Sequence, residues 1–181
     1  NWDWATNGTM GKRERRILTS IYLEPHEEEI TNLRLLNRWK TIQANEVRYK
    51  EYFLDDAEIV IVGFGTAGRI ALSAVREARA EGIKVGLLRP VTVSPFPSDV
   101  IDQLTARTSA FLVTEMNSGQ MLEDVRLAVR GRVPVEFYGR LGGVVPFHHE
   151  ILDEIRRMTK SKPRLDVHPR DAWLERMASI V

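Results

Sequence analysis

The chain has 181 residues, of which 43% are hydrophobic and 28% are charged. Its 26 Lys and Arg residues against 25 Asp and Glu residues give a net charge of +1. The electric field of such a small net charge is too weak to attract nucleic acid or a membrane surface. Cysteine is absent, which excludes disulfide bonds and cysteine-bound zinc or iron–sulfur clusters in this chain. Because no apolar run approaches the roughly 20 residues of a membrane span and no signal peptide opens the chain, we expect a cytoplasmic protein.

The first 54 residues combine an apolar N-terminal stretch with a long helix. Residues 1–23 contain apolar side chains that this stretch cannot bury by itself: Trp2, Trp4, Ile17, Leu18, Ile21, Tyr22 and Leu23. We expect an irregular or short-strand segment that contacts another domain or subunit. Glu24-Pro25 predicts a helix start, and apolar residues at helical spacing extend this helix from about His26 to Phe53. At 1.5 Å per residue the helix would be about 40 Å long, so we interpret it as a connecting arm.

Residues 55–160 alternate between short apolar runs and amphipathic segments. The expected strands are Ala57–Val62, Ile83–Leu88, Ser109–Glu115 and Pro134–Tyr138. The expected helices run from about Thr66 to Ala80, Ser98 to Thr105, Gly119 to Arg130 and Phe147 to Met158. This order predicts an α/β fold, a three-layer sandwich with a mainly parallel, Rossmann-like sheet. In the tail, residues 161–181, we expect a short amphipathic piece around Trp173 that docks on the same body or on a neighbour.

The sequence AEIVIVGFGTAG, residues 57–68, places Gly63, Gly65 and Gly68 in the spacing G-x-G-x-x-G directly after a β-branched run. This spacing is typical of dinucleotide-binding units, in which the glycines let backbone N–H groups approach a pyrophosphate. An acidic residue should end the next strand, but Arg89-Pro90 stands there instead. An arginine at this place could bind the 2′-phosphate of NADP, so the motif could still bind a dinucleotide. Alternatively, the glycines are needed only for a tight turn and a closely packed helix, and the motif binds no ligand. Both interpretations stay open.

Loops after the carboxyl ends of parallel strands are the usual ligand-binding places in such a fold. Here they supply one carboxylate, Glu115, and two arginines, Arg89 and Arg140, which do not form a catalytic constellation. We expect Glu115 to neutralise one of the arginines. The cluster His148–Glu150 contains metal-ligand types but lacks the i, i+4 spacing of a two-histidine helical site, so we predict a capping or surface role. We assign no catalytic, cofactor-binding or metal-binding residue.

Four stretches in this order resemble a known family: EIVIVGFGTAGRIA, VGLLRPVTVSPFP, VTEMNSGQMLEDVRLAV and FYGRLGGVVPFHHEIL. They are similar to the α subunit of 2-oxoacid:ferredoxin oxidoreductases, above all the 2-ketoisovalerate and 2-oxoglutarate enzymes, and the resemblance runs from about Trp4 to Met158. It implies the end of a pyrimidine-binding domain and a helical linker arm for residues 1–54. It implies a transketolase C-terminal-like domain for residues 55–160, and it leaves the tail, residues 161–181, unmatched.

By this resemblance the complete enzyme depends on thiamine diphosphate and decarboxylates a 2-oxoacid oxidatively in the presence of coenzyme A. It passes the electrons through iron–sulfur clusters to ferredoxin. The glutamate that activates thiamine, the Mg²⁺ site and the clusters belong to other domains or subunits, so the resemblance implies no catalytic or cofactor-binding residue in this fragment and no activity of the fragment alone. It implies contact with β and γ or δ subunits, and no nucleic-acid or membrane partner.

We therefore expect a non-catalytic assembly role. The strand-end residues expected to face partner subunits or the active site are Arg89, Pro90, Glu115, Asn117, Gln120, Arg140, Gly142 and Gly143. Two alternatives stay open. One is a small NAD(P)-binding domain that uses Gly63, Gly65, Gly68 and Arg89, and the other is a scaffolding module that dimerises through its arm helix.

Overall fold

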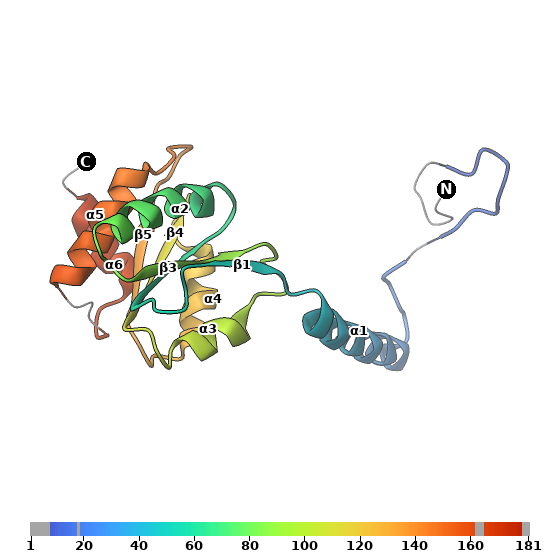
Figure 1. The fold of residues 1–181 in the computed structure, drawn as a ribbon. Coiled ribbons are helices and arrows are strands. Elements are labelled where there is room, and N and C mark those ends of the chain that lie inside the picture. Colours follow the sequence, from blue (N-terminus) through green and yellow to red (C-terminus); the bar gives the residue numbers. More distant parts are fainter. Residues whose placement is uncertain (1–7, 18, 162–164, 179–181) are drawn as a thin grey trace. The chain divides into compact units, whose positions relative to one another are not determined.

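The structure, a computed structural model, describes residues 8–17, 19–161 and 165–178. The expectations for Trp2, Trp4 and Leu18 concern residues outside these ranges. The chain forms two units, Asn1–Thr41 and Ile42–Val181, and the second contains the sheet (Figure 1).

Residues 8–17 and 19–24 form neither helix nor strand, in agreement with the expected irregular segment. Helix α1 (Pro25–Asn45) begins at the predicted proline, with Glu27 and Glu28 in its first turn, where they stabilise the positive end of the helix dipole. None of its side chains is buried, and apolar ones that are 38–58% exposed are Ile30, Leu33, Leu35, Leu36 and Trp39.

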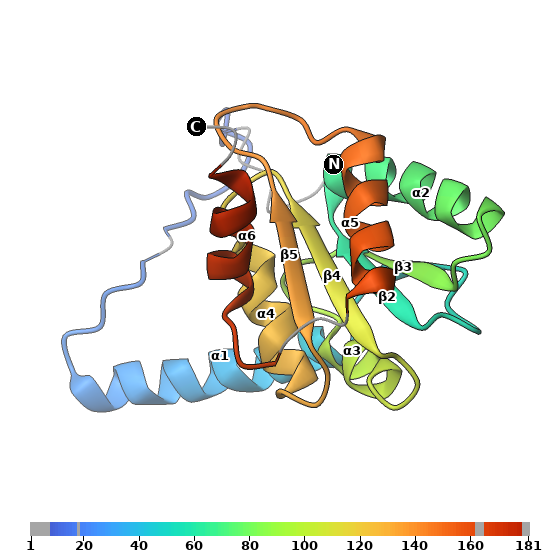
Figure 2. The same ribbon diagram turned by 90° about the vertical axis from the view of Figure 1, so that its left-hand side faces the viewer.

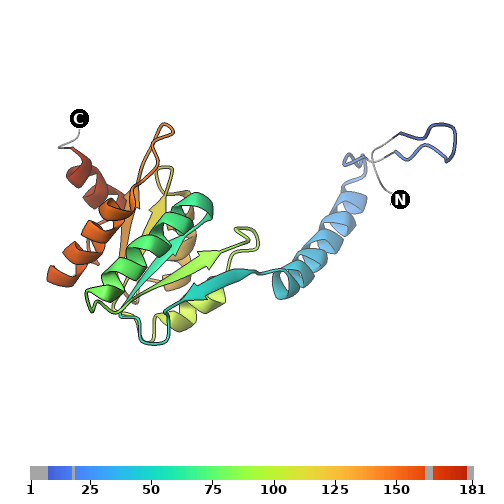
Figure 3. The same ribbon diagram turned by 45° about the horizontal axis from the view of Figure 1, so that its top comes forward.

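The helix ends at Asn45, so the prediction that it continues to Phe53 is wrong. Strand β1 (Tyr49–Tyr52) follows instead and pairs antiparallel with β3 (Val85–Pro90) (Figure 3). Aromatic residues in this stretch favour extended backbone, and pairing with β3 supplies the backbone hydrogen bonds that a helix would have supplied. The apolar residues after Asn45 that mimic helical spacing are thus strand residues.

Five strands form one sheet in the order β1-β3-β2-β4-β5 (Figure 2). The strands β2 (Ile59–Gly63), β3, β4 (Ala110–Glu115) and β5 (Val135–Gly139) are parallel, and β1 is an antiparallel edge strand. Every residue of β2 and β4 is buried because helices cover both faces of the sheet. The predicted, mainly parallel sheet is confirmed, and its parallel strands lie within two residues of the expected bounds.

Helices α2 (Gly65–Ala80) and α5 (His148–Lys160) pack together on one face of the sheet, and α3 (Ser98–Leu104) and α4 (Gln120–Val129) pack together on the other (Figure 2). The largest fully buried side chains between these layers include Phe111, Phe137, Ile61, Leu87, Leu112, Leu122, Ile151 and Ile155. The predicted three-layer α/β sandwich is therefore confirmed. Among the described residues, no helix is long and apolar enough to cross a membrane.

Helix α6 (Pro169–Met177) packs on the edge strand β5 of the same unit. Trp173 is only 3% exposed, its ring meets the ring of Phe137 edge-on with centroids 5.1 Å apart, and its Nε1 donates to Gly139 O at 3.2 Å. Arg176 Nη2 donates to Phe137 O at 2.8 Å. Two carbonyl groups of an edge strand thus find donors on α6, which covers the edge that would otherwise be free to pair with another strand.

A network of four charged side chains lies under α6. Arg157 Nη2 lies 2.8 Å from Glu136 Oε2, and Arg176 Nε lies 3.1 Å from Glu154 Oε1. Both glutamates are buried, so each needs the positive partner that the arginines provide. Burial by itself would lower the pKa of Arg157, because it disfavours the charged form. The nearby carboxylates of Glu154 and Glu136 have the larger combined effect, so the pKa of Arg157 is raised.

Replacing Trp173 with alanine should lower the unfolding free energy by about 3–5 kcal/mol, because the substitution empties a buried site and leaves Gly139 O without its donor. The neighbouring Leu174 is 52% exposed, so Leu174→Ala should change stability by less than about 0.5 kcal/mol. Urea unfolding followed by circular dichroism measures both. Similar losses in the two variants would show that α6 does not pack on β5 as described.

Candidate functional site

The carboxyl ends of the four parallel strands meet at one edge of the sheet, and we call this the carboxyl edge. The chain leaves β2 toward β3 on one side and returns to β4 on the other, so the topological switch point lies between β2 and β4. A crevice of about 340 Å³ opens there between the start of α2, which follows β2, and the loop that follows β4. Its lining residues are Phe64, Gly65, Thr66, Ala67, Thr114, Glu115, Met116 and Asn117.

The glycine turn after β2 is required by packing. Gly65 has φ +57°, and α2 starts at this residue. A Cβ on Gly68 would lie 2.3 Å from Gly63 O and 3.1 Å from Arg89 Cγ. No side chain fits in this contact, so Gly68 allows the first turn of α2 to lie directly on the end of β2. This packing requirement accounts for the glycine motif whether or not the turn also binds a ligand.

Glu115 caps helix α4 and does not pair with an arginine. Its two carboxylate oxygens accept hydrogen bonds from Met121 N at 3.0 Å and Leu122 N at 2.9 Å, and the residue is buried. Asn117 Oδ1 also accepts from Gln120 N at 3.0 Å. Since the carboxylate already satisfies free N–H groups at the helix start, the expectation that Glu115 neutralises an arginine is wrong, while its structural role is confirmed.

Arg140 pairs with Glu150 at the start of α5. Arg140 Nη2 lies 2.7 Å from Glu150 Oε1, and Glu150 Oε2 accepts from Phe147 N at 2.7 Å. The predicted capping role within the cluster His148–Glu150 is therefore confirmed for Glu150. The two histidines have other neighbours: His148 lies 3.7 Å from Glu77, and the ring of His149 stacks on Phe147. The part of the chain that the structure describes holds no group of three or more His, Asp or Glu side chains placed to bind a metal ion.

The eight predicted strand-end residues all lie at the carboxyl edge but not in one place. Arg140 N donates to Glu115 O at 3.2 Å, which joins the ends of β4 and β5. Gln120 is the exposed first residue of α4, and Gly142 and Gly143 are exposed in the loop before α5, with φ +63° and +85°. Arg89 and Pro90 end β3, which β2 separates from β4.

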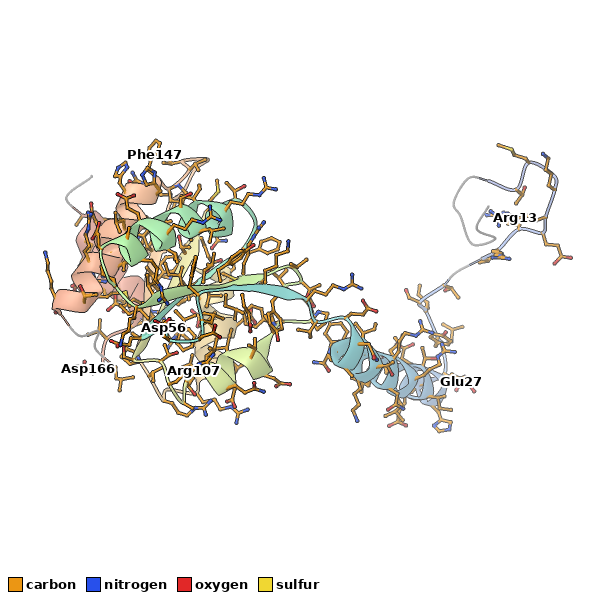
Figure 4. The ribbon with its side chains drawn as sticks, in the orientation of Figure 1. Arg13, Glu27, Asp56, Arg107, Phe147 and Asp166 are labelled. Carbon is orange, nitrogen blue, oxygen red and sulfur yellow. The ribbon has the colours of Figure 1, made fainter. Side chains whose placement is uncertain are left out.

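Exposed apolar side chains in all four loops of the carboxyl edge were not singled out from the sequence. We call them the apolar rim, and they are Phe64, Val91, Val93, Met116, Leu141, Val144, Val145 and Phe147. They are 38–59% exposed, and Figure 4 shows Phe147 at the outer side of α5. Each loop contributes only one to four of these residues, so no single loop stands out in the sequence. The apolar rim is recognised only when the topology of the sheet brings the four loops to one edge. Lys50 on β1 was also missed, because the sequence assigned it to a helix.

Comparison with solved structures defines the class of fold. The structure matches 2-oxoglutarate:ferredoxin oxidoreductase from Magnetococcus marinus with a TM-score of 0.62 at 20% identity, covering 75% of this chain and 24% of that chain. It matches a split-gene transketolase with a TM-score of 0.53 at 17% identity, covering 61% and 40%. The domain is therefore a transketolase-like α/β domain.

Sequence comparison identifies the family. Residues 57–151, more than half of the chain, match the family model of pyruvate:ferredoxin oxidoreductase core domain II, and the chain belongs to this family. Ketoisovalerate oxidoreductase subunit VorB of Methanothermobacter thermautotrophicus is 48% identical over 157 residues, which are 86% of this chain and 44% of the relative. The 2-oxoglutarate synthase subunit KorA of Methanothermobacter marburgensis is 33% identical over 137 residues, 75% and 36%. The chain thus spans less than half the length of these relatives, and the resemblance inferred from the sequence is confirmed.

Glu115→Gln should lower the unfolding free energy by about 1–2 kcal/mol, because an amide keeps one acceptor and loses the charge that faces two N–H groups of α4. Glu175→Gln replaces an exposed glutamate on α6 and should be nearly neutral, within about 0.5 kcal/mol. Chemical denaturation of both variants measures the difference. An unchanged midpoint for Glu115→Gln would contradict the capping role.

Tyr138 should make the protein less stable at alkaline pH. Burial, followed by the negative charge of Glu150, raises the pKa of its hydroxyl. Above about pH 10 the tyrosine of the unfolded chain ionises while folded Tyr138 keeps its proton, so the unfolding free energy falls as pH rises. Thermal melts from about pH 8 to 11 should show a smaller loss for Tyr138→Phe than for the unmodified chain. Tyr49→Phe, at a 40% exposed tyrosine, is the control, and an identical loss in all three proteins would contradict this assignment.

Proposed function

We propose that this chain is the C-terminal part of the α subunit of a thiamine-diphosphate-dependent 2-oxoacid:ferredoxin oxidoreductase. The complete enzyme would decarboxylate a 2-oxoacid to an acyl-CoA and reduce ferredoxin, and its cytoplasmic location belongs to the same proposal. The 48% identity to a ketoisovalerate oxidoreductase subunit, against 33% to a 2-oxoglutarate synthase subunit, supports 2-ketoisovalerate as the substrate. We keep the division into residues 1–54, 55–160 and 161–181 as a proposal, in which β1 of the first part completes the sheet and α6 of the last part packs on β5.

The described residues do not fit a site for Mg²⁺ or an iron–sulfur cluster. At the carboxyl edge, the carboxylates of Glu115 and Glu150 are engaged by backbone N–H groups and by Arg140. The described ranges contain no cluster of acidic or histidine side chains suited to a metal, and the sequence has no cysteine to bind a cluster. We therefore propose that thiamine diphosphate, Mg²⁺ and the clusters are held by other domains and subunits, and that this domain contributes to assembly.

The single observation that supports an assembly role is the apolar rim. Monomeric domains rarely expose apolar side chains from four adjacent loops on one edge, and such a surface is typical of a contact with another protein. The predicted residues Arg89, Pro90, Glu115, Asn117, Gln120, Arg140, Gly142 and Gly143 lie at the same edge. We propose that this edge faces the other subunits, with the polar residues at the border of the contact.

The test places acidic side chains in the rim of the complete enzyme, which is then purified with its partner subunits. The double variant Val144→Asp/Phe147→Asp should lose the partner subunits or lower turnover of 2-ketoisovalerate at least about tenfold, because a contact would then have to bury unpaired charges. Leu127→Asp is the matched control, since Leu127 is 78% exposed on α4, outside the rim. Circular dichroism confirms that each variant is folded. Normal assembly and turnover of the double variant would overturn the proposal.

A further inference from the structure

Helix α2 differs from the other helices that begin at the carboxyl edge. The helices α3, α4 and α5 have Asp99, Glu123 and Glu150 in their first turns, and Glu115 also caps α4. Helix α2 has no acidic residue in its first turn, and its N-cap residue, Phe64, makes no side-chain hydrogen bond. The partial positive charge at the start of this 16-residue helix is therefore not neutralised by a side chain.

Arg89 lies beside this helix start, and Lys50 is its neighbour on the next strand. Arg89 on β3 lies directly opposite Lys50 on β1, and its Cγ would be 3.1 Å from a Cβ on Gly68 in the first turn of α2. Residues directly opposite in an antiparallel pair share one face, where like charges repel. Within the described ranges, neither side chain has an ion pair or a side-chain hydrogen bond, and Arg89 Nε is buried without a partner. Arg69 adds a third cation at the fifth position of α2.

The crevice at the switch point lies on the other side of the same helix start. Its lining includes the 46% exposed ring of Phe64 and the fully buried Thr114. In the part of the chain that the structure describes, Thr114 Oγ1 has no hydrogen-bond partner. Open α/β sheets bind ligands in the crevice at the topological switch point. Here that crevice and the positively charged Arg89 both lie at the start of α2.

We propose that the start of α2, together with Arg89 and Lys50, binds the phosphate group of a small-molecule ligand whose remaining part occupies the crevice. A phosphate has several acceptor oxygens and up to two negative charges, which match free helix N–H groups, a guanidinium and an ammonium group at one place. In dinucleotide-binding folds, a carboxylate at the end of this strand binds the two hydroxyl groups of a ribose. Arg89 occupies that place here, and its positive charge favours a phosphate as the ligand. The inference goes beyond the proposed assembly role and does not depend on it.

Calorimetric titration of the full chain with adenosine, ADP, pyrophosphate and inorganic phosphate tests the proposal. ADP should bind saturably and more tightly than pyrophosphate or phosphate, because it also offers a ring to the crevice, and adenosine should give no saturable heat. Raising the KCl concentration should weaken ADP binding, since the exposed charges are screened.

The variants identify the groups responsible. Arg89→Gln and Lys50→Gln should each weaken ADP binding by about tenfold or more, the loss of one charge-assisted contact. Arg107→Gln is the control, because Arg107 is an exposed cation between α3 and β4, away from the carboxyl edge (Figure 4). Silence with every phosphate compound at millimolar concentration would overturn the inference, as would equal binding of adenosine and ADP or an equal loss in Arg107→Gln. None of these results bears on the test of the apolar rim, so the two proposals can fail separately.

Discussion

The contact between the backbones of Gly63 and Gly68 sets the position of α2 on the sheet. Because a Cβ on Gly68 would lie 2.3 Å from Gly63 O, the helix can begin directly on the end of β2 only without a side chain there. That close start places Phe64 and the first turn of α2 opposite the loop after β4 and so forms the crevice. It also brings the uncapped end of α2 beside Arg89, which makes this corner of the carboxyl edge electropositive.

The other charged groups of the carboxyl edge hold the fold together. Glu115 fixes the start of α4, and Glu150 fixes the start of α5 and holds Arg140. A carboxylate with both oxygens occupied in this way is poorly placed to act as a general base, which needs a free oxygen within reach of a substrate proton. The same strand ends that supply catalytic groups in many α/β enzymes therefore supply helix caps here, which agrees with the proposal that other domains and subunits provide the chemistry.

The sequence predicts the parallel sheet well because each strand is buried on both faces and leaves a continuous apolar run, as Ile59–Gly63 does. It fails at Tyr49–Tyr52, where a short edge strand is decided by its pairing with β3 and not by its own periodicity. For the site, sequence spacing locates the glycine turn and the strand ends. It does not reveal that Glu115 bonds to the backbone of Met121 and Leu122, nor that Lys50 lies opposite Arg89, because both depend on how separate elements are placed in the fold.

The two lateral edges of the sheet are closed to partners by different means. On one side, Trp173 and Arg176 of α6 occupy carbonyl groups of β5, so no further strand can pair there without displacing the helix. On the other side, β1 has only four residues and places the charged Lys50 and Glu51 on its two faces, which opposes extension of the sheet. Helices cover both faces, so of the surfaces of the sheet it is the carboxyl edge, with its apolar rim, that offers a partner a large apolar contact. With both faces covered and both lateral edges blunted, the loops after the strands are the part of the sheet at which exposed apolar side chains gather, which agrees with the proposed assembly role.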